Sequence, residues 1–229
     1  MTSINDFKIE DAPTAEAFLR NIYQTNLFLT ARHLLGYKEI TQKTHDSLIQ
    51  ALESKTKRKL IVMPRGTFKS SLASVAYPIW LLLQNPNLRI LLDSEIYSNS
   101  KNFLREIKAH LENKEVTDLF GVFKSDTWNE GEAIIKQRTK NVKEASLTAG
   151  GIGTEKTGQH YDVIIMDDMN SPNNSNSPEN CEKVIQHFRY CQSILEPEGI
   201  LVLIGTRYHE RDLIGEVLHN VINQENIEL

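Results

Sequence analysis

The segment LIVMPRGTFKSSL (residues 60–72) joins an apolar run to a polar turn and then to the start of a helical pattern. The run KLIVM (59–63), apolar after Lys59, has the length and composition of a strand that is buried on both faces. Gly66 permits backbone angles that other residues avoid. A helical pattern follows from about Lys69 to Leu83. The segment therefore predicts a strand–loop–helix unit, whose loop leads into a helix N-terminus where backbone N–H groups attract anions.

The same segment partly matches the phosphate-binding pattern G-x-x-x-x-G-K-[ST]. In that pattern backbone N–H groups surround the phosphates, the lysine reaches the β- and γ-phosphates, and the hydroxyl binds Mg²⁺. Lys69 and Ser70 are retained, but Met63 and Phe68 occupy the two glycine positions. The letters alone fail the pattern, whereas the strand–loop–helix context supports it. On this segment alone, a solvated turn without a ligand is an equally good interpretation.

A second strand supplies the acidic groups that such a loop needs. YDVIIMDD (residues 161–168) is a buried run that ends in two carboxylates, and charges at the end of a buried strand are costly without a cation or a partner. Asp167 is the expected Mg²⁺ ligand. Asp168 is expected to orient and deprotonate the attacking water. Many such ATPases carry Glu at the second place, and Asp168 reaches one methylene less far.

A third strand, GILVLIGT (residues 199–206), ends in Thr206, which is placed to sense a γ-phosphate. The carboxyl ends of parallel strands meet at one edge of a sheet, where α/β proteins bind ligands. We therefore expect the three strand ends at 63–70, 167–168 and 205–207 to form one crevice. This conjunction favours a working nucleotide site over a solvated turn.

The remaining pattern predicts an α/β fold with a parallel sheet covered by helices on both faces. Residues 1–55 read as a helical N-terminal extension, with Thr41 as an N-cap, and residues 56–229 as the core domain. Ser177 and Pro178 predict the start of a helix at 178–194. The other expected elements are helices at 14–35, 41–54, 98–114 and 210–221, a strand at 88–93, and a pair of strands at 132–138 and 144–151.

Composition sets wide bounds on function. The 229 residues carry a net charge of −4 and 40% hydrophobic residues, an ordinary globular balance that does not indicate nucleic-acid binding overall. The basic run at 55–59 is either a DNA contact or a solvated approach to a strand. Cys181 and Cys191 lie ten residues apart in one expected helix, about 15 Å along its axis, which is too far for a disulfide. No stretch reaches the ~18 apolar residues of a membrane span, so a soluble, intracellular protein is expected.

Four segments together resemble the ATPase motor domain of the large terminase subunit of tailed double-stranded DNA phages. These are MPRGTFKSS (63–71), HYDVIIMDDMNSP (160–172), LIGTRYHERDL (203–213) and LLGYKEITQKTHDSLIQAL (34–52). The resemblance covers nearly the whole chain and implies a P-loop NTPase fold of the ASCE (RecA-like) type. The family commonly has Arg-Gly-x-Gly-Lys-Ser/Thr, so Phe68 is the departure, and it affects the expected nucleotide affinity or turnover.

The resemblance also implies roles for individual residues. The catalytic set is Asp168, Lys69, Arg65 and Lys156, where Lys156 is the basic finger that acts on a neighbouring subunit's ATP and Arg138 is the alternative for that role. The nucleotide-binding set is Met63, Pro64, Arg65, Gly66, Thr67, Phe68, Lys69, Ser70 and Ser71. The Mg²⁺ ligands are Ser70 and Asp167. Gly205, Thr206 and Arg207 couple hydrolysis to movement, and residues 1–55 lie on the adenine side.

The function implied by the resemblance is Mg²⁺-dependent ATP hydrolysis that drives double-stranded DNA into a procapsid in the cytoplasm of an infected bacterium. Implied partners are the small terminase subunit, the portal protein and further copies in a ring on the portal, with a monomer in isolation. The chain ends at Leu229, so no nuclease domain or activity is expected. Two other interpretations stay open: a fragment of another P-loop translocase or helicase, and a degenerate nucleotide-binding scaffold in which Phe68 blocks the phosphates.

Overall fold

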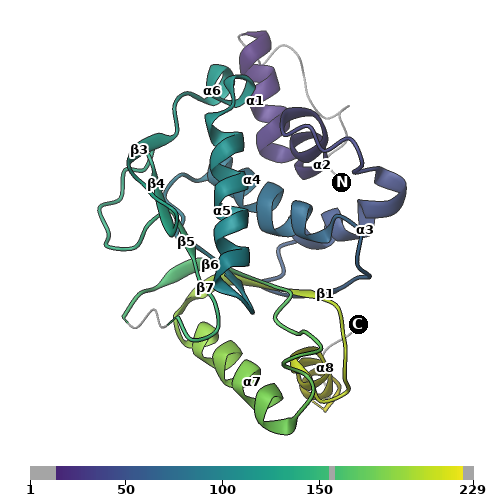
Figure 1. The fold of residues 1–229 in the computed structure, drawn as a ribbon. Helices are drawn as coiled ribbons and strands as arrows, with labels where there is room; N and C mark the ends of the chain where they lie inside the picture. Colours follow the sequence, from purple (N-terminus) through teal and green to yellow (C-terminus); the bar gives the residue numbers. More distant parts are fainter. Residues whose placement is uncertain (1–13, 155–157, 224–229) are drawn as a thin grey trace.

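The fold is built on one seven-stranded sheet, seen in a computed structural model that describes residues 14–154 and 158–223 (Figure 1). The strand order is β1-β7-β6-β2-β5-β4-β3. The strands are β1 (Arg58–Val62), β2 (Ile90–Ser94), β3 (Lys124–Trp128), β4 (Glu132–Ile135), β5 (Leu147–Ala149), β6 (Tyr161–Asp167) and β7 (Leu195–Gly205).

The five strands from β1 to β5 in this order are parallel, whereas β4 is antiparallel to both β5 and β3. The expected strands at 88–93, 132–138 and 144–151 are present with shifted ends. The sheet is mostly parallel, as expected, and the short β3–β4 hairpin at its edge turns back on itself, so that β4 meets β5 in the opposite direction. β7 lies between β1 and β6, so the loop after β1 and the acids after β6 are two strands apart.

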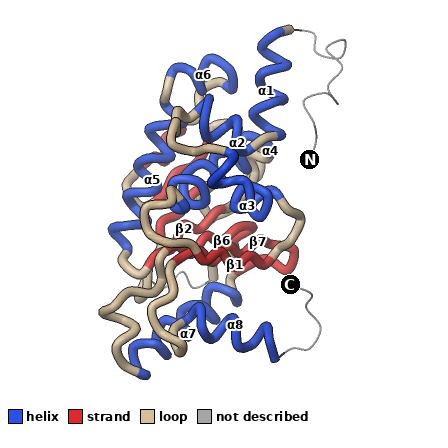
Figure 2. The backbone as a smooth tube through the Cα atoms, turned by 90° about the vertical axis from the view of Figure 1, so that its right-hand side faces the viewer, coloured by secondary structure: helices blue, strands red, loops and turns tan. Residues whose placement is uncertain are grey.

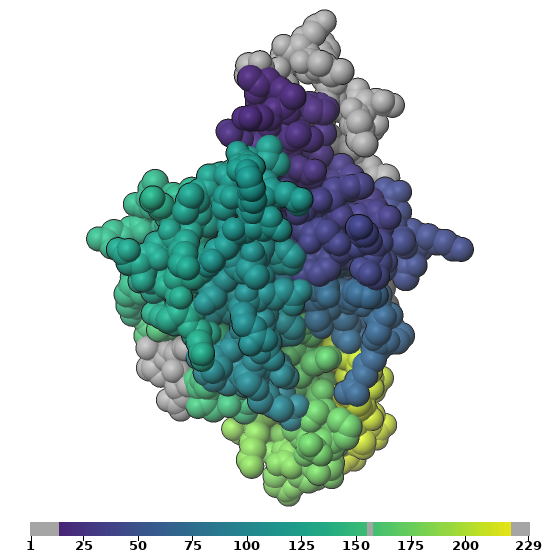
Figure 3. All heavy atoms as spheres, turned by 45° about the horizontal axis from the view of Figure 1, so that its top comes forward, coloured from purple at the N-terminus to yellow at the C-terminus, as the bar shows by residue number. Residues whose placement is uncertain are grey.

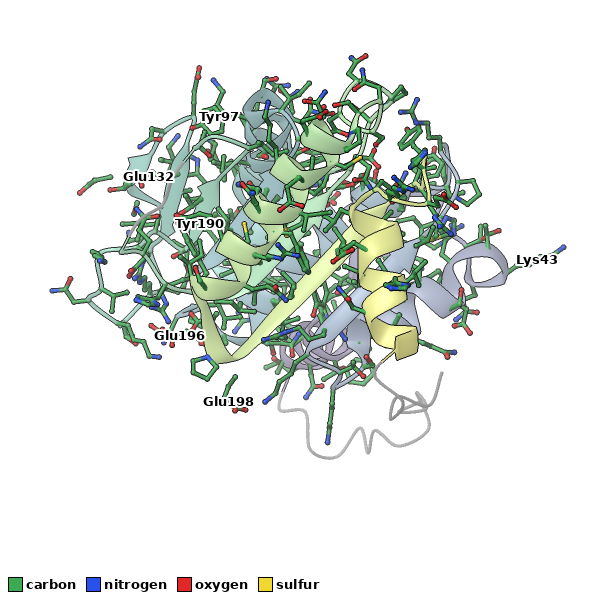
Figure 4. All side chains as sticks on the ribbon, turned by 90° about the horizontal axis from the view of Figure 1, so that it is seen from below. Lys43, Tyr97, Glu132, Tyr190, Glu196 and Glu198 are labelled. Carbon is green, nitrogen blue, oxygen red and sulfur yellow. The ribbon has the colours of Figure 1, made fainter. Side chains whose placement is uncertain are left out.

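The helices form a layer on each face of the sheet (Figures 1 and 2). One face carries most of them, and α7 and α8 lie side by side on the other, as Figure 4 shows from below. The helices are α1 (Ala15–Thr25), α2 (Leu27–Leu29), the π-helix η3 (Thr30–Leu34), α3 (Gln42–Glu53), the π-helix η4 (Ser71–Ala76), α4 (Tyr77–Gln84), α5 (Tyr97–Glu112), α6 (Lys114–Phe120), α7 (Pro178–Ser193) and α8 (Leu213–Asn223).

The central strands are apolar on both faces, because each face is covered. Successive side chains of a strand point to opposite sides. Along β6, Val163 and Ile165 pack under η4, α4 and α5, whereas Ile164 and Met166 pack under α7 and α8. This alternation explains why β6 reads as one continuous apolar run.

The N-terminal helices differ in detail from the expected pair. The periodic pattern at 14–35 breaks at Asn26, whose side chain accepts a hydrogen bond from Leu29 N, and the segment ends at Gly36 with φ +80°. Thr41 precedes α3 as expected, but its hydroxyl caps no backbone N–H there. Figure 3 shows these purple and indigo segments against the teal middle of the chain.

The α7 expectations are confirmed. Ser177 accepts a hydrogen bond from Asn180 N at 3.2 Å, and Pro178 is the first residue of the helix. Cys181 and Cys191 both lie on α7, and both thiols are buried and free. Over the described ranges, none of the helices combines the length and the apolar character that crossing a bilayer requires.

Candidate active site

The loop after β1 runs directly into a helix, as its sequence predicts. Met63 N donates to Gly205 O at 3.2 Å, which extends the β1–β7 pairing by one residue. Gly66 has φ +77°, a left-handed conformation that glycine adopts without steric cost. Helical geometry begins at Lys69 and continues through η4 and α4 to Gln84. The first helical N–H groups therefore face the carboxyl edge of the sheet.

Phe68 keeps the backbone geometry of the glycine that it replaces. Its φ is +52°, within the left-handed region. Its ring is 41% exposed and meets the His45 ring of α3 edge to face, with centroids 6.5 Å apart. His45 in turn contacts Thr67 O through Nε2 at 3.1 Å. The side chain therefore lies against α3, and the loop is held to the N-terminal helices.

Lys69 and Asp168 face each other at the carboxyl edge of the sheet. Lys69 is 5% exposed, and its Nζ lies 3.8 Å from Asp168 Oδ1. Asp168 follows the last residue of β6 with φ +47°, and its N–H donates to Ile204 O at 3.0 Å. This turn directs the second carboxylate toward the lysine instead of along the strand.

Asp167 is the most buried acid of the site. Its Oδ2 accepts a hydrogen bond from Ser74 Oγ at 2.5 Å. Burial raises the pKa of Asp167 to about 6, against the opposing effect of the Ser74 and Ser70 hydroxyls. Within the described chain, Asp167 Oδ1 and Asp168 Oδ1 are buried and accept no hydrogen bond.

Asp167 Oδ1, which accepts no hydrogen bond, lies with the Ser70 hydroxyl that contacts Asp167 and with the carboxylate of Asp168 that is ion-paired to Lys69. This set of oxygen atoms fits a small, hard cation, since Mg²⁺ prefers oxygen ligands. Ser70 and Asp167, the expected Mg²⁺ ligands, are therefore brought together. Lys69 Nζ lies near the same oxygens and suits an anion bound next to that cation. The arrangement combines a cation position, a fixed positive charge and a carboxylate.

The segment that follows β7, from Thr206 onward, is hydrogen-bonded to the loop that follows β1. Thr206 Oγ1 donates to Met63 O at 3.1 Å, so this hydroxyl is engaged by the first loop residue. The Arg65 guanidinium donates to Tyr208 Oη and lies 5.5 Å from the centre of that ring. Gly205 adjoins the acids, because a Cβ there would lie 3.5 Å from Asp168 Oδ1. The side chains of Thr206 and Arg65 thus join the loop after β1 to the segment after β7 at two points.

Two predicted residues lie elsewhere, and a third is not described. Arg207 lines a hollow between α7 and α8 with Glu210 and Arg211. Arg138 is bound within its own loop, where it donates to the carbonyl oxygens of Lys140, Val142 and Glu144. Lys156 lies outside the described residues. Of the remaining loop residues, Thr67 Oγ1 donates to Pro64 O at 2.8 Å, and Ser71 begins η4.

Two contributors escaped the sequence analysis. Ser74 holds Asp167, and its signal is its position four residues after Ser70, one turn along the same helix face. Asp212 is 1% exposed and accepts hydrogen bonds from Tyr208 N, His209 N and Gly215 N. It thereby shapes the turn that carries Tyr208 to Arg65. An acid just before an apolar helix pattern is the signal for such a cap.

The strand order β1-β7-β6, with the loop after β1 and the acids after β6, defines an α/β domain of the P-loop class. No protein-family model matches the chain, and no curated protein matches it. Solved structures do match by fold. The large terminase of bacteriophage HK97 has a TM-score of 0.62 at 12% identity, over 89% of this chain and 42% of that one.

Two further structures show the same fold. A mutant of the large terminase ATPase domain of Thermus phage P74-26 gives a TM-score of 0.50 at 16% identity, over 77% of this chain and 68% of that one. A variant of S. cerevisiae Dbp5, bound to Nup159, Gle1, IP6 and ADP, gives 0.53 at 13% identity, over 86% and 49%. The chain thus has a terminase-like ATPase fold and spans less than half of the HK97 protein.

Proposed function

We propose that this chain hydrolyses Mg²⁺-bound ATP and that turnover drives the movement of double-stranded DNA, as part of a viral packaging motor. The proposal rests above all on the meeting of Lys69 Nζ with Asp168 Oδ1, 3.8 Å apart, beside the unpaired Oδ1 of Asp167. A phosphate-binding lysine, a cation ligand and a water-activating carboxylate are the parts that phosphoryl transfer to water requires.

Each part has one task. Ser70 and Asp167 would hold Mg²⁺, which would supply positive charge next to the phosphates. Lys69 and the loop N–H groups bind the same phosphates. Asp168 accepts a proton from water as the water oxygen bonds to the γ-phosphorus and the bond to the bridging oxygen of ADP breaks. Catalysis is then mainly positioning and charge stabilisation.

Coupling to movement follows from the two contacts between the loop and the segment after β7. Thr206 bonds to Met63 O, and Arg65 bonds to Tyr208, so a shift of the loop on phosphate release moves the segment that leads to α8. The DNA substrate and a ring of copies that contact the portal and the small terminase subunit are supported by the fold shared with two phage terminases. In this proposal Lys156 supplies the neighbour's finger, and residues up to 55 border the adenine.

The test is Mg²⁺-dependent ATP hydrolysis over a range of protein concentrations, with and without double-stranded DNA. Asp168→Asn removes the proton acceptor and Lys69→Ala removes the cation that binds the phosphates, and each is expected to lower kcat at least about 100-fold. Activity per protein should rise with concentration if a neighbouring subunit completes the site. Lys114→Ala and Asp118→Asn are matched controls, since these exposed side chains pair with each other on α6.

Equal turnover in the wild type and both site variants would reject an ATPase at this site. A second candidate, a fragment of another P-loop nucleic-acid translocase or helicase, is favoured by the fold likeness to Dbp5, which is bound to ADP in its solved structure. Stimulation of hydrolysis by single-stranded RNA and not by double-stranded DNA would support that candidate over the packaging motor.

A further inference from the structure

A buried cluster of three polar side chains lies on the sheet face opposite the nucleotide site. Asp93, near the end of β2, meets His187 and Cys191 of α7. The exposed fractions of the side chains of Asp93 and His187 are 1% and 9%, and Cys191 is fully buried. Figure 4 looks at this face and labels Tyr190, whose ring lies 6.1 Å from that of His187.

The three ligand-type atoms are close together. His187 Nε2 lies 2.6 Å from Asp93 Oδ2, and Cys191 Sγ lies 3.6 Å from each of them. His187 and Cys191 are four residues apart, so one face of α7 presents both. Gly150 leaves room for their neighbour Asp93, since a Cβ at Gly150 would lie 2.7 Å from Asp93 Oδ1.

These distances nearly match the edges of a tetrahedral zinc site. With Zn–S of about 2.3 Å and Zn–N and Zn–O of about 2.1 Å, tetrahedral angles place sulfur about 3.6 Å from the nitrogen and the oxygen. Both sulfur edges have this length already. Only the distance from His187 Nε2 to Asp93 Oδ2 has to change. It is 2.6 Å here and about 3.4 Å in such a site, so it has to lengthen by about 0.8 Å when a metal ion replaces the proton that these two atoms share.

The chemistry of the three side chains selects the ion. Thiolate, imidazole and carboxylate are all ligands that Zn²⁺ accepts, and three protein ligands leave a fourth position for water. Mg²⁺ takes oxygen ligands and disfavours sulfur. The partly exposed edge of His187 gives an ion a way in.

We propose that Asp93, His187 and Cys191 form a Zn²⁺ site that fastens α7 to the end of β2. Binding displaces two protons with no change of oxidation state: the S–H proton of Cys191 goes to solvent, and the proton that His187 Nε2 shares with Asp93 is given up as the neutral imidazole takes its proton on Nδ1. Asp93 faces α7, whereas Asp167 on the neighbouring strand faces η4, so this site and the proposed Mg²⁺ site lie on opposite faces of the sheet. The site does not depend on ATP hydrolysis.

The experiment is a Co²⁺ titration of the untagged full chain, kept reduced with a non-thiol reductant, followed by displacement with Zn²⁺. The wild type is expected to bind one Co²⁺ with a thiolate-to-cobalt absorption band in the near ultraviolet. Zn²⁺ should abolish the band and raise Tm, and excess Mg²⁺ should do neither.

Cys191→Ser is expected to remove the band and to weaken Zn²⁺ binding more than about 100-fold, since the loss of a group that only supports a ligand costs 10–100-fold. Cys181→Ser is the matched control, because Cys181 is also a buried free thiol on α7, and it should bind like the wild type. The band of the wild type needs no variant, so it decides the case even if Cys191→Ser fails to fold. Absence of the band, or its persistence in folded Cys191→Ser, would overturn the proposal and leave a hydrogen-bonded link between α7 and β2.

Discussion

Phe68 and Asp168 hold left-handed backbone angles on opposite sides of the crevice, with φ of +52° and +47°. This region costs a residue with a side chain about 1–2 kcal/mol. Such strain persists only where the surroundings impose it, and it is common at functional sites. Here the loop and the β6 turn are both held by bonds to β7, from Gly205 O and Ile204 O.

Phe68→Gly is expected to leave the free energy of unfolding unchanged or to raise it slightly. Relief of the left-handed strain offsets the greater freedom of glycine in the unfolded chain, about 0.5–1 kcal/mol, and the loss of the His45 contact. Phe68→Val places a β-branched residue at positive φ, an outlier conformation, and should be about 1–2 kcal/mol less stable than Phe68→Gly. Urea unfolding of both variants checks this, and equal stability would show that the loop relaxes freely.

Asp167→Asn should stabilise the protein in Mg²⁺-free buffer while abolishing hydrolysis. Burial raises the pKa of Asp167 to about 6, so the charged form that prevails at pH 7.5 is unfavourable, by at most about 3 kcal/mol. Asn keeps an acceptor for Ser74 without the charge. Thermal unfolding in chelator checks the gain in stability, with Asp118→Asn as the surface control. A loss of stability instead would mean that the buried charge is already compensated.

At the scale of elements, the turn 208–215 is organised by one side chain. Asp212 accepts from Tyr208 N and Gly215 N at 2.8 Å each and from His209 N at 3.1 Å. It therefore caps the start of α8 and also fixes the residue that contacts Arg65. The closing helix and the loop are tied through this turn.

Asp212→Ala should lower the free energy of unfolding by about 1–2 kcal/mol, the cost of a lost N-cap with its buried donors. Asp212→Asn keeps one acceptor oxygen and should fall between Ala and the wild type. Because the turn also positions Tyr208 against Arg65, hydrolysis should weaken in the same order. Chemical denaturation and steady-state kinetics on the three proteins test both rankings, and a wild-type value for Asp212→Ala would contradict the cap.

The elements that sequence predicted well are those with a local signal. The buried strands β1, β6 and β7 are apolar runs, and the N-terminus of α7 has Ser177 and Pro178 in their usual places. β3 escaped prediction because KSDTW is polar and half exposed at the sheet edge, where little apolar surface needs burial. The break at Asn26 depends on a side-chain bond that competes with helix continuation.

At the scale of the whole molecule, Arg89 connects the starts of several strands at the sheet edge opposite the candidate site. Its side chain donates to Asp162 at 2.8 and 3.0 Å and to Glu196 at 2.7 Å, and Glu144 lies 3.8 Å away. These acids stand near the starts of β6, β7 and β5, and Arg89 itself precedes β2. Figure 4 shows Glu196 at the beginning of β7.

Acid should weaken this junction. Burial alone would raise the pKa of Asp162, but the bonds from Arg89 outweigh it and hold the pKa below its usual value near 3.8. Because the pKa of Asp162 is lower in the folded state, its pairing with Arg89 stabilises the folded protein above about pH 4. This stabilisation is lost as pH falls through the pKa of the folded state. Asp162→Asn should therefore cost about 1–3 kcal/mol at pH 7, and this deficit should shrink below pH 4. Unfolding free energies from pH 7 to 3 measure it, and a deficit that does not vary with pH would exclude the charge effect.

The sequence predicted the residues of the candidate site because each of them follows a buried strand. Lys69, Asp167 and Asp168 come after apolar runs, and an apolar run is a local signal that locates a strand along the chain. The insertion of β7 between β1 and β6 has no local mark, because strand order is decided by packing across the whole sheet. The cluster of Asp93 with His187 and Cys191 was missed for the same reason, since its members lie 94 and 98 residues apart. Arg207 was assigned to the site by motif alone. In the structure it lines the hollow between α7 and α8.

The contacts that build the crevice are distant along the chain, which has a kinetic consequence. The bond from Ser74 to Asp167 spans 93 residues, and that from Thr206 to Met63 spans 143. Closing such long loops costs entropy before any contact compensates, so pairings of this kind form late in folding. If the site binds a nucleotide as proposed, the nucleotide meets no binding surface until the sheet is complete. Added nucleotide should then lower the rate of unfolding of the native protein and leave the rate of folding unchanged.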